Sequence, residues 1–222
     1  QAEPSRTISF TKAIGEAMAV ALEIFPTSYV IGLGATDPAG IFGTTRGLAE
    51  TFGKDRVLDM PISENAVTGI VLGSAIDGMR PILTHQRLDF ALVSIEQLVN
   101  QAAKWHYMFG GIMSAPIVVR LVVGRGWGQG PQHSQSLQSW FAHIPGLKVV
   151  MPALPADAKG LLLAAVADPN QSTRKGRQRT QGQCRVRPII HDSIEIEMPW
   201  ALQYVVVFIN TRGAHDVHRV TQ

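Results

Sequence analysis

The chain has 222 residues, of which 45% are hydrophobic and 17% are charged, and it contains one cysteine, Cys184. This composition is typical of a globular protein with a sizeable core, and it excludes a chain that is disordered throughout. A single cysteine excludes an intramolecular disulfide framework and a multi-cysteine zinc site, and it fits a reducing compartment. The net charge of +3 is only weak support for nucleic-acid binding, and no apolar run approaches the ~20 residues that a membrane-spanning helix needs.

Helix-like and strand-like patterns alternate along the chain as far as Asn170. The first pattern is an apolar stripe of Ile14, Met18 and Leu22 at helical spacing, which ends at Pro26. Strands that alternate with helices indicate an α/β fold, in which right-handed crossovers build a mostly parallel sheet with helices on both faces. We expect, in chain order, a helix over residues 11–25, a strand over 29–34, a helix over 48–52, a strand over 56–60, a helix over 64–77, a strand over 80–84, a helix over 89–107, a strand over 115–123, a short helical turn before a strand over 147–151, and a helix over 155–167.

Three polar segments follow predicted strands, and they therefore lie where α/β sheets bind ligands, beyond the carboxyl ends of the strands. Glu64 opens a predicted helix after Ser63, a good N-cap, although the helix dipole favours a carboxylate there without any further function. Residues 84–90 follow the next strand. The Gly-rich stretch 127–136 carries His133, and glycines let a backbone approach a ligand closely. Histidine exchanges protons near neutral pH, but a lone loop histidine is more often structural.

The composition changes after Asn170. Residues 171–188 are rich in arginine, glutamine and glycine and include no acidic residue, which is typical of a flexible basic linker. This segment is also the candidate for nucleic-acid binding, but it has no interleaved aromatic residues to stack on bases, so we expect no nucleic-acid partner. Residues 189–222 form an atypical C-terminal segment in which a strand is predicted around residues 204–209.

Three motifs of the chain resemble those of one protein family. They are Pro61-Ile62-Ser63-Glu64, Gln132-His133-Ser134-Gln135 and Pro145-Gly146-Leu147-Lys148-Val149. From Arg6 to Asn170 the chain resembles the beta subunit of the thiamine-diphosphate-dependent, decarboxylating component of 2-oxo acid dehydrogenase complexes. The resemblance implies a transketolase-like pyrimidine-binding domain over residues 1–170, a basic linker over 171–188, and an atypical segment over 189–222 with the family's second domain missing.

The resemblance also implies a shared active site. It predicts an oxidoreductase subunit of a heterotetramer, which decarboxylates a 2-oxo acid and passes the acyl group to a lipoyl acyltransferase component. The family's diphosphate-binding motif, Gly-Asp-Gly…Asn, is absent from this sequence. In two-chain members that motif lies on the alpha subunit. The resemblance therefore implies an alpha-subunit partner that holds the Mg²⁺ ion with most of the ligands. No membrane partner is implied, and we expect the protein in the cytoplasm, or in the mitochondrial matrix if its source is eukaryotic.

The same resemblance implies roles for individual side chains. It implies that Glu64 hydrogen-bonds the aminopyrimidine ring of thiamine diphosphate, and that His133 acts on the bound substrate. His85 stands where better-known members carry an aromatic residue that stacks on the aminopyrimidine, and an imidazole can also stack. Asp37 takes the place of acidic residues at the start of the family's first loop, and Gln86 is a further expected cofactor contact.

Two further sites are open at this stage. Arg87 either binds a substrate carboxylate or pairs with Asp89. In some family members the region that resembles Asp168 and Asn170, with a main-chain carbonyl near Ile117, holds a structural monovalent cation. We therefore expect a K⁺ site there.

The family pattern breaks after Asn170, which leaves three interpretations of function. The first is the catalytic beta subunit. The second is a truncated, non-catalytic relative that binds only its partner or cofactor, and the third is a split transketolase-like carboligase. A shifted reading frame, a truncation or a fusion would account for the break. The sheet would then lack a strand unless residues 204–209 fill the gap, so we expect a marginally stable, aggregation-prone monomer.

Overall fold

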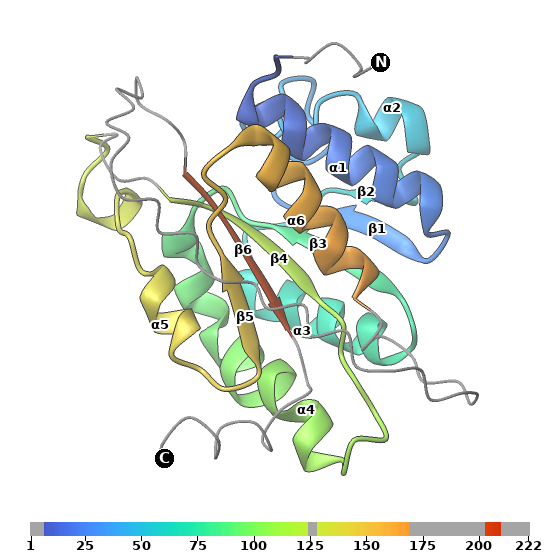
Figure 1. Cartoon of the computed structure of the whole chain (residues 1–222), viewed down its shortest axis with the longest axis vertical. Coiled ribbons are helices and arrows are strands. Elements are labelled where there is room, and N and C mark those ends of the chain that lie inside the picture. Colours follow the sequence, from blue (N-terminus) through green and yellow to red (C-terminus); the bar gives the residue numbers. More distant parts are fainter. Residues whose placement is uncertain (1–6, 124–127, 169–202, 210–222) are drawn as a thin grey trace, which may run out of the picture.

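A computed structural model describes residues 7–123, 128–168 and 203–209 of the chain. The strands are β1 (Ser28–Ile31), β2 (Val57–Leu58), β3 (Arg80–Thr84), β4 (Val118–Val123), β5 (Leu147–Val150) and β6 (Gln203–Ile209). They form a six-stranded sheet in the order β2-β1-β3-β4-β6-β5, which runs through the centre of the molecule (Figure 1). The α-helices are α1 (Phe10–Ile24), α2 (Leu48–Phe52), α3 (Glu64–Ile76), α4 (Ala103–Met108), α5 (Gln138–Ala142) and α6 (Pro155–Ala167).

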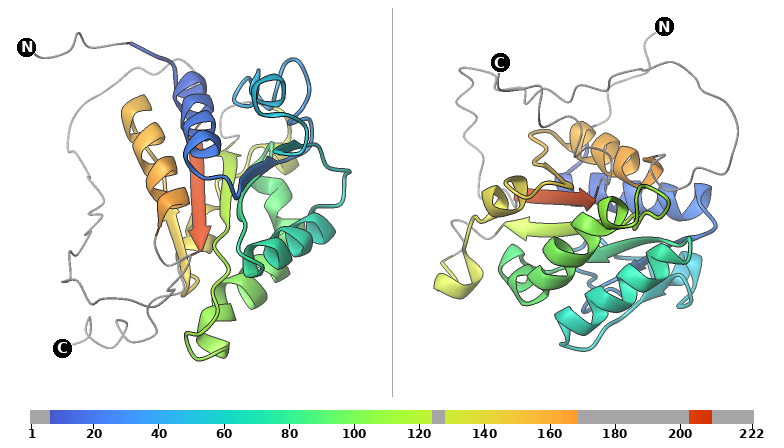
Figure 2. Two further views of the ribbon diagram at one scale, coloured as in Figure 1. Left: turned by 90° about the vertical axis from the view of Figure 1, so that its right-hand side faces the viewer. Right: turned by 90° about the horizontal axis from the view of Figure 1, so that it is seen from below.

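Helices cover both faces of the sheet, which confirms the predicted α/β fold (Figure 2). Helices α1 and α6 pack side by side on one face, where Ile82 and Val118 join their apolar side chains in one core. Helices α3 and α5 lie on the other face, where Leu83 and Val119 belong to a second core. Because successive side chains of a strand point to opposite faces, alternate residues of β3 and β4 serve the two cores.

The predicted parallel arrangement holds for β1, β2, β3 and β4. Strand β1 pairs in parallel with β2 and with β3, and β3 pairs in parallel with β4. All six residues of β4 are buried, as expected for an interior strand that is covered on both faces. The carboxyl ends of these four strands therefore lie at the same edge of the sheet.

Strand β6 confirms the strand predicted around residues 204–209, and it gives the sheet its antiparallel component. It lies between β4 and β5 and runs antiparallel to both, in register along the whole length of each. The gap expected after Asn170 is thus filled inside the sheet, and β5, not β6, forms the outer strand (Figure 1). The basic linker predicted over residues 171–188 lies outside the described residues.

The single helix predicted over residues 89–107 is wrong in its geometry. The structure has a 3₁₀ helix at Leu88–Ser94, a π-helix at Gln97–Ala102 and then α4. The loop before β5 packs against this irregular segment, where the Lys104 ammonium donates to the Pro145 carbonyl at 2.9 Å. Such long-range contacts override the helical spacing of the local sequence. Strands β2 and β4 are also shorter than predicted, and no helix among the described residues is long and apolar enough to cross a lipid bilayer.

Removal of β6 should unmask two unpaired strand edges. We expect a chain that stops at residue 202 to aggregate, because β4 and β5 would each expose a row of unpaired backbone groups. A chain that stops at residue 209 keeps the β6 pairings and is the matched control. Size-exclusion chromatography and thermal unfolding of the two chains provide the measurement, and equal behaviour would show that β6 contributes nothing to the sheet.

Gly146 allows the loop before β5 to approach the irregular helix. Its φ is +98°, and a Cβ atom built there would lie 2.1 Å from the Ala103 carbonyl oxygen. We expect Gly146→Ala to lower the free energy of unfolding by roughly 3 kcal/mol, since both the backbone conformation and the contact are strained. Gly160 lies within α6 with open space around it, so Gly160→Ala should be neutral or stabilising by about 0.5 kcal/mol. Chemical denaturation of the two variants tests the contrast.

Candidate functional site

Three loops meet at the carboxyl edge of the sheet. The loop after β1 and the end of β2 are joined by Asp59, whose Oδ1 accepts from the backbone N–H of Gly34 at 2.7 Å and of Met60 at 2.8 Å. The loop after β3 reaches the loop after β1 through Gln86, whose Nε2 donates to the Leu33 carbonyl at 3.3 Å. The segments that the sequence analysis placed at this edge therefore do lie together there.

Glu64 is the first residue of α3 and has a half-buried side chain. Its carboxylate lies in the first turn of a 13-residue helix, where the unpaired backbone N–H groups favour a negative charge. Ser63 occupies the predicted N-cap position, but its side chain makes no capping hydrogen bond, and its backbone N–H donates to the Pro61 carbonyl at 2.8 Å. The start of α3 thus lacks a side-chain cap from Ser63.

The turn after β3 holds the loop that carries His133. The buried guanidinium of Arg87 donates through Nη1 to the His133 carbonyl at 3.3 Å and through Nη2 to the Gln129 side-chain oxygen. Asp89 Oδ1 accepts from the Gln135 backbone N–H at 3.2 Å and from its Nε2 at 2.9 Å. We call residues 128–136 the histidine loop, and Arg87, Asp89 and their neighbour Phe90 the clamp.

The clamp also orients the imidazole of His133. The rings of Phe90 and His133 meet edge to face, with centroids 5.6 Å apart and an interplanar angle of 89°. Such a perpendicular arrangement is a favourable geometry for two aromatic rings. The His133 side chain is half-buried, so it remains accessible from the edge of the sheet.

Arg87 lies within the protein rather than in open solvent. Only 6% of its surface is exposed, and its guanidinium carbon lies 5.5 Å from the centroid of the Phe42 ring, a cation–π distance. Burial lowers the pKa of Arg87, and the neighbouring charge of Asp89 opposes that effect. The structure gives Arg87 contacts to the histidine loop and to Phe42. Its two predicted roles, substrate binding and pairing with Asp89, remain predictions.

His85 is buried and neutral. It is 3% exposed, and its backbone N–H donates to the carbonyl of Arg120 on β4 at 3.0 Å. Burial, followed by the positive charge of Arg120, lowers the pKa of His85 to about 4. Its Nε2 has no hydrogen-bond partner within the described part of the chain. A buried polar atom without a partner costs free energy, so this atom is a candidate contact for a bound molecule.

Asp37 and the expected cation site complete the predicted set. Asp37 is exposed in the loop after β1, and its backbone N–H donates to the Gly34 carbonyl at 3.2 Å. The Asp168 carboxylate pairs with the Lys148 ammonium at 3.0 Å, and Ile117 is buried just before β4. Asn170 lies outside the described residues, which contain no group of three histidine, cysteine or acidic side chains suited to a metal ion. The K⁺ site stays a prediction.

The sequence analysis assigned no role to several side chains that build this edge. Gln129 and Gln135 join the histidine loop to the clamp, while Phe42 contacts Arg87. Arg120 was hidden in a strand predicted from its apolar residues. A charged residue inside such a buried strand is itself a signal, because arginine is rarely buried without a specific demand.

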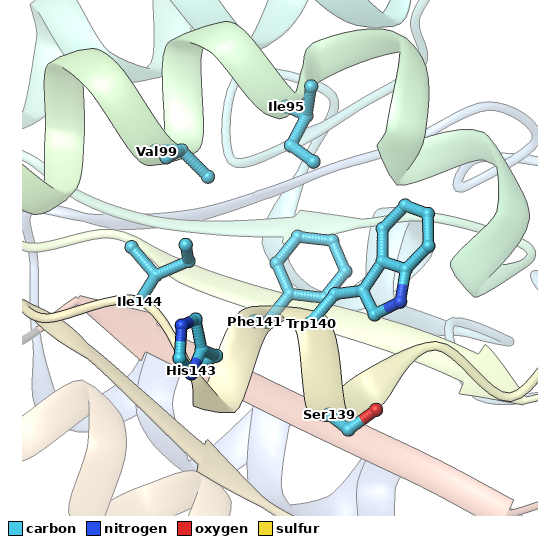
Figure 3. A pocket seen from close by; sticks show the side chains of 7 residues that line it. All are labelled: Ile95, Val99, Ser139, Trp140, Phe141, His143 and Ile144. Carbon is cyan, nitrogen blue, oxygen red and sulfur yellow. The ribbon is translucent and has the colours of Figure 1, made fainter.

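A separate apolar pocket of about 500 Å³ lies on the α5 face of the sheet (Figure 3). The side chains of Ile95 and Val99 approach it from the irregular helical segment, and Trp140 and Ile144 approach it from α5 and its following turn. None of the residues that line this pocket belongs to the clamp or to the histidine loop. His143, considered structural from the sequence, lies at this pocket.

The sequence that builds these loops matches a family model. The model of "Transketolase, pyrimidine binding domain" matches residues 6–173. The chain belongs to this family. Over 164 residues it is 44% identical to a pyruvate dehydrogenase E1 component subunit beta of Rhizobium meliloti, in an alignment that covers 74% of this chain and 36% of the relative.

Other similar proteins carry different substrate names. The chain is 43% identical to the beta subunit of an acetoin:2,6-dichlorophenolindophenol oxidoreductase of Bacillus subtilis, over 74% of this chain and 52% of the relative. It is 44% identical to a 2-oxoisovalerate dehydrogenase subunit beta of the same species, over 72% of this chain and 49% of the relative. The chain thus spans about half or less of the length of these curated relatives.

A solved structure shares the fold. The inactive beta4 tetramer of a split-gene transketolase superposes with a TM-score of 0.55 at 20% sequence identity, over 72% of this chain and 48% of that one. This likeness supports the fold of the domain and is too distant in sequence to carry a function.

Loss of the Arg87 contacts should loosen the histidine loop. We expect Arg87→Met to raise amide hydrogen exchange within residues 128–136 by roughly tenfold, because the bonds to the His133 carbonyl and to Gln129 are lost. Arg46 is exposed in the loop after β1, so Arg46→Met is the matched control and should leave this exchange unchanged. Exchange measured by mass spectrometry decides the point, and an unaltered histidine loop in Arg87→Met would contradict the clamp.

Proposed function

We propose that this chain is the pyrimidine-binding part of the beta subunit of a thiamine-diphosphate-dependent 2-oxo acid dehydrogenase. One observation carries the proposal: Glu64, His85 and the clamped histidine loop gather at one edge of a sheet whose residues 6–173 match the pyrimidine-binding family. The similarity to beta subunits named for pyruvate and 2-oxoisovalerate supports the same reaction class.

The residues present fit an aminopyrimidine ring. Such a ring offers both donors and acceptors on a flat apolar body. The neutral, buried imidazole of His85 provides a flat surface and an unpartnered nitrogen, and the half-buried Glu64 provides a carboxylate. We infer that Glu64 binds the ring nitrogen and that His85 lies against the ring, with Asp37 and Gln86 in the adjoining loops. When bound, thiamine diphosphate supplies the electron sink that lets a 2-oxo acid lose CO₂.

The chain's own residues would hold and move protons at this edge. Glu64, held at the start of α3, would hydrogen-bond the ring and so favour one tautomer of it. His133, oriented by Phe90 and carried on the clamped loop, is placed to hydrogen-bond the substrate or to exchange a proton with it. Arg87 keeps that loop in place, and its charge would attract an anionic 2-oxo acid.

A second chain would complete the site. We propose an alpha subunit that carries the Gly-Asp-Gly…Asn motif and most of the Mg²⁺ and diphosphate contacts, and a lipoyl acyltransferase component as the acyl acceptor. A K⁺ ion at Asp168, Asn170 and the Ile117 carbonyl belongs to the same proposal. The support for a partner is that this chain spans about half or less of the relatives it matches and that their names denote subunits.

Neutralising Glu64 should abolish the reaction while leaving the fold intact. In a complex of this chain with the alpha subunit of its source, we expect Glu64→Gln to lower the rate of 2-oxo acid decarboxylation by roughly 10²-fold or more. Glu50 is also in the first turn of a helix but is exposed on α2, so Glu50→Gln is the matched control. The rate is followed with pyruvate or 2-oxoisovalerate and an artificial electron acceptor, and cofactor binding is followed by calorimetry.

The other interpretations give different outcomes in the same assay. Transfer of an aldehyde unit without lipoyl acylation would favour a split carboligase. A folded complex that binds thiamine diphosphate but decarboxylates no 2-oxo acid would overturn the catalytic proposal and favour the non-catalytic relative.

A further inference from the structure

We propose that Arg120 is a positioning residue of this site, whose guanidinium holds the loop after β1 and whose backbone carbonyl holds the turn after β3 at His85. The inference deepens the proposed function and rests on it only for the identity of the molecule that these loops hold. The positions of the loops and the state of His85 can be measured without any ligand.

Burial of Arg120 is the first observation. It lies in the middle of β4 among valine and leucine residues, has no exposed surface, and is among the largest fully buried side chains among the described residues. An aliphatic side chain would fill the same space in a strand without the desolvation of a charge. A buried arginine at this position is therefore explained by its hydrogen bonds rather than by the apolar core.

The guanidinium of Arg120 holds the loop after β1. Its Nη2 donates to the Thr44 hydroxyl at 2.8 Å, and that hydroxyl in turn donates to the Ile41 carbonyl. The same turn is closed from the other side by Thr45, whose Oγ1 accepts from the Ile41 backbone N–H at 2.9 Å. Helix α1 is packed so tightly against it that a Cβ at Gly15 would lie 2.9 Å from the Thr44 carbonyl oxygen.

This turn presents Phe42 to the clamp. Phe42 has a φ of +50°, the one non-glycine residue with a positive φ among those described. A non-glycine side chain is strained in this conformation, so it persists only where the surroundings enforce it. The hydrogen bonds that join Ile41 to Thr44 and Thr45 close the turn around Phe42, whose ring contacts the Arg87 guanidinium. Arg120 is thus linked through Thr44 and this turn to the clamp and the histidine loop.

The backbone of Arg120 holds the turn after β3. Its carbonyl accepts from the His85 N–H, and Thr84 is its register partner on β3. The other charged side chains of that turn, Arg87 and Asp89, contact Gln129 and Gln135 of the histidine loop. Arg120 thus supplies the positive charge that, together with burial, keeps His85 neutral.

The test is a pair of measurements on the full chain without cofactor or partner. The pKa of His85 is measured by NMR titration, with the His85 signal identified by its loss in His85→Gln, and amide exchange is measured over residues 37–47. In Arg120→Met we expect the pKa of His85 to rise above about 4 but to stay below 6.5, because the neighbouring charge is gone while burial, the larger cause, remains. We also expect the exchange to rise by roughly tenfold. Arg80 lies at the opposite end of β3, where it donates to Val166, so Arg80→Met is the matched control.

Two milder variants separate the hydrogen bonding of Arg120 from the effect of its charge, and they remain informative if Arg120→Met does not fold. Arg120→Lys keeps the charge but not the reach, so His85 should stay neutral at pH 5.5 while exchange over residues 37–47 rises. Thr44→Val removes the hydroxyl that accepts from Arg120 and donates to the Ile41 carbonyl, and it keeps the arginine, so exchange should rise with the pKa of His85 unchanged. The proposal is overturned if His85 of the unmodified chain titrates near 6.5, or if neither Arg120→Lys nor Thr44→Val alters the exchange. Because no cofactor is present, failure of the proposed function leaves these outcomes unaffected.

Discussion

The parallel pairing of β1, β2, β3 and β4 is the constraint on which the rest of the structure depends. Parallel strands need crossovers, and each crossover here begins at the same edge of the sheet. Residues that are far apart in the chain therefore meet there: the Gly34 N–H donates to Asp59, and Gln86 reaches the Leu33 carbonyl. Glu64 begins its helix at the same edge. The parallel direction of the strands therefore brings the residues of the candidate site together.

Polar side chains that are themselves buried hold this edge together. Arg120 and Thr44 fix one loop, and Arg87 and Asp89 fix another. Such groups are costly to bury unless their hydrogen bonds are made, so the loops have few alternative positions in which all of these bonds persist. That property suits the proposed function, in which His133 and Glu64 would keep a defined position relative to a bound ring.

The sheet includes a strand from outside residues 6–173, the range that the family model matches. Strand β6 lies beyond that limit, and it fills the space between β4 and β5 in the antiparallel direction. A strand pairs with its neighbours in a sheet largely through backbone hydrogen bonds, and many different apolar sequences can form these bonds. A sheet can therefore take in such a strand without any change in the particular side chains of the candidate site.

The sequence by itself determined the alternation of helices and strands, the α/β class and the edge at which Glu64, His85 and His133 lie, because apolar periodicity and turn residues are local signals. It did not determine the break of residues 88–108 into three helical types, which accompanies the close packing of Gly146 on Ala103. Nor did it determine the direction of β6 or the bonds of Arg87 and Arg120. Those depend on which segments meet in space, and the tertiary structure alone decided them, since a buried side chain takes its partner from neighbours that are remote in the chain.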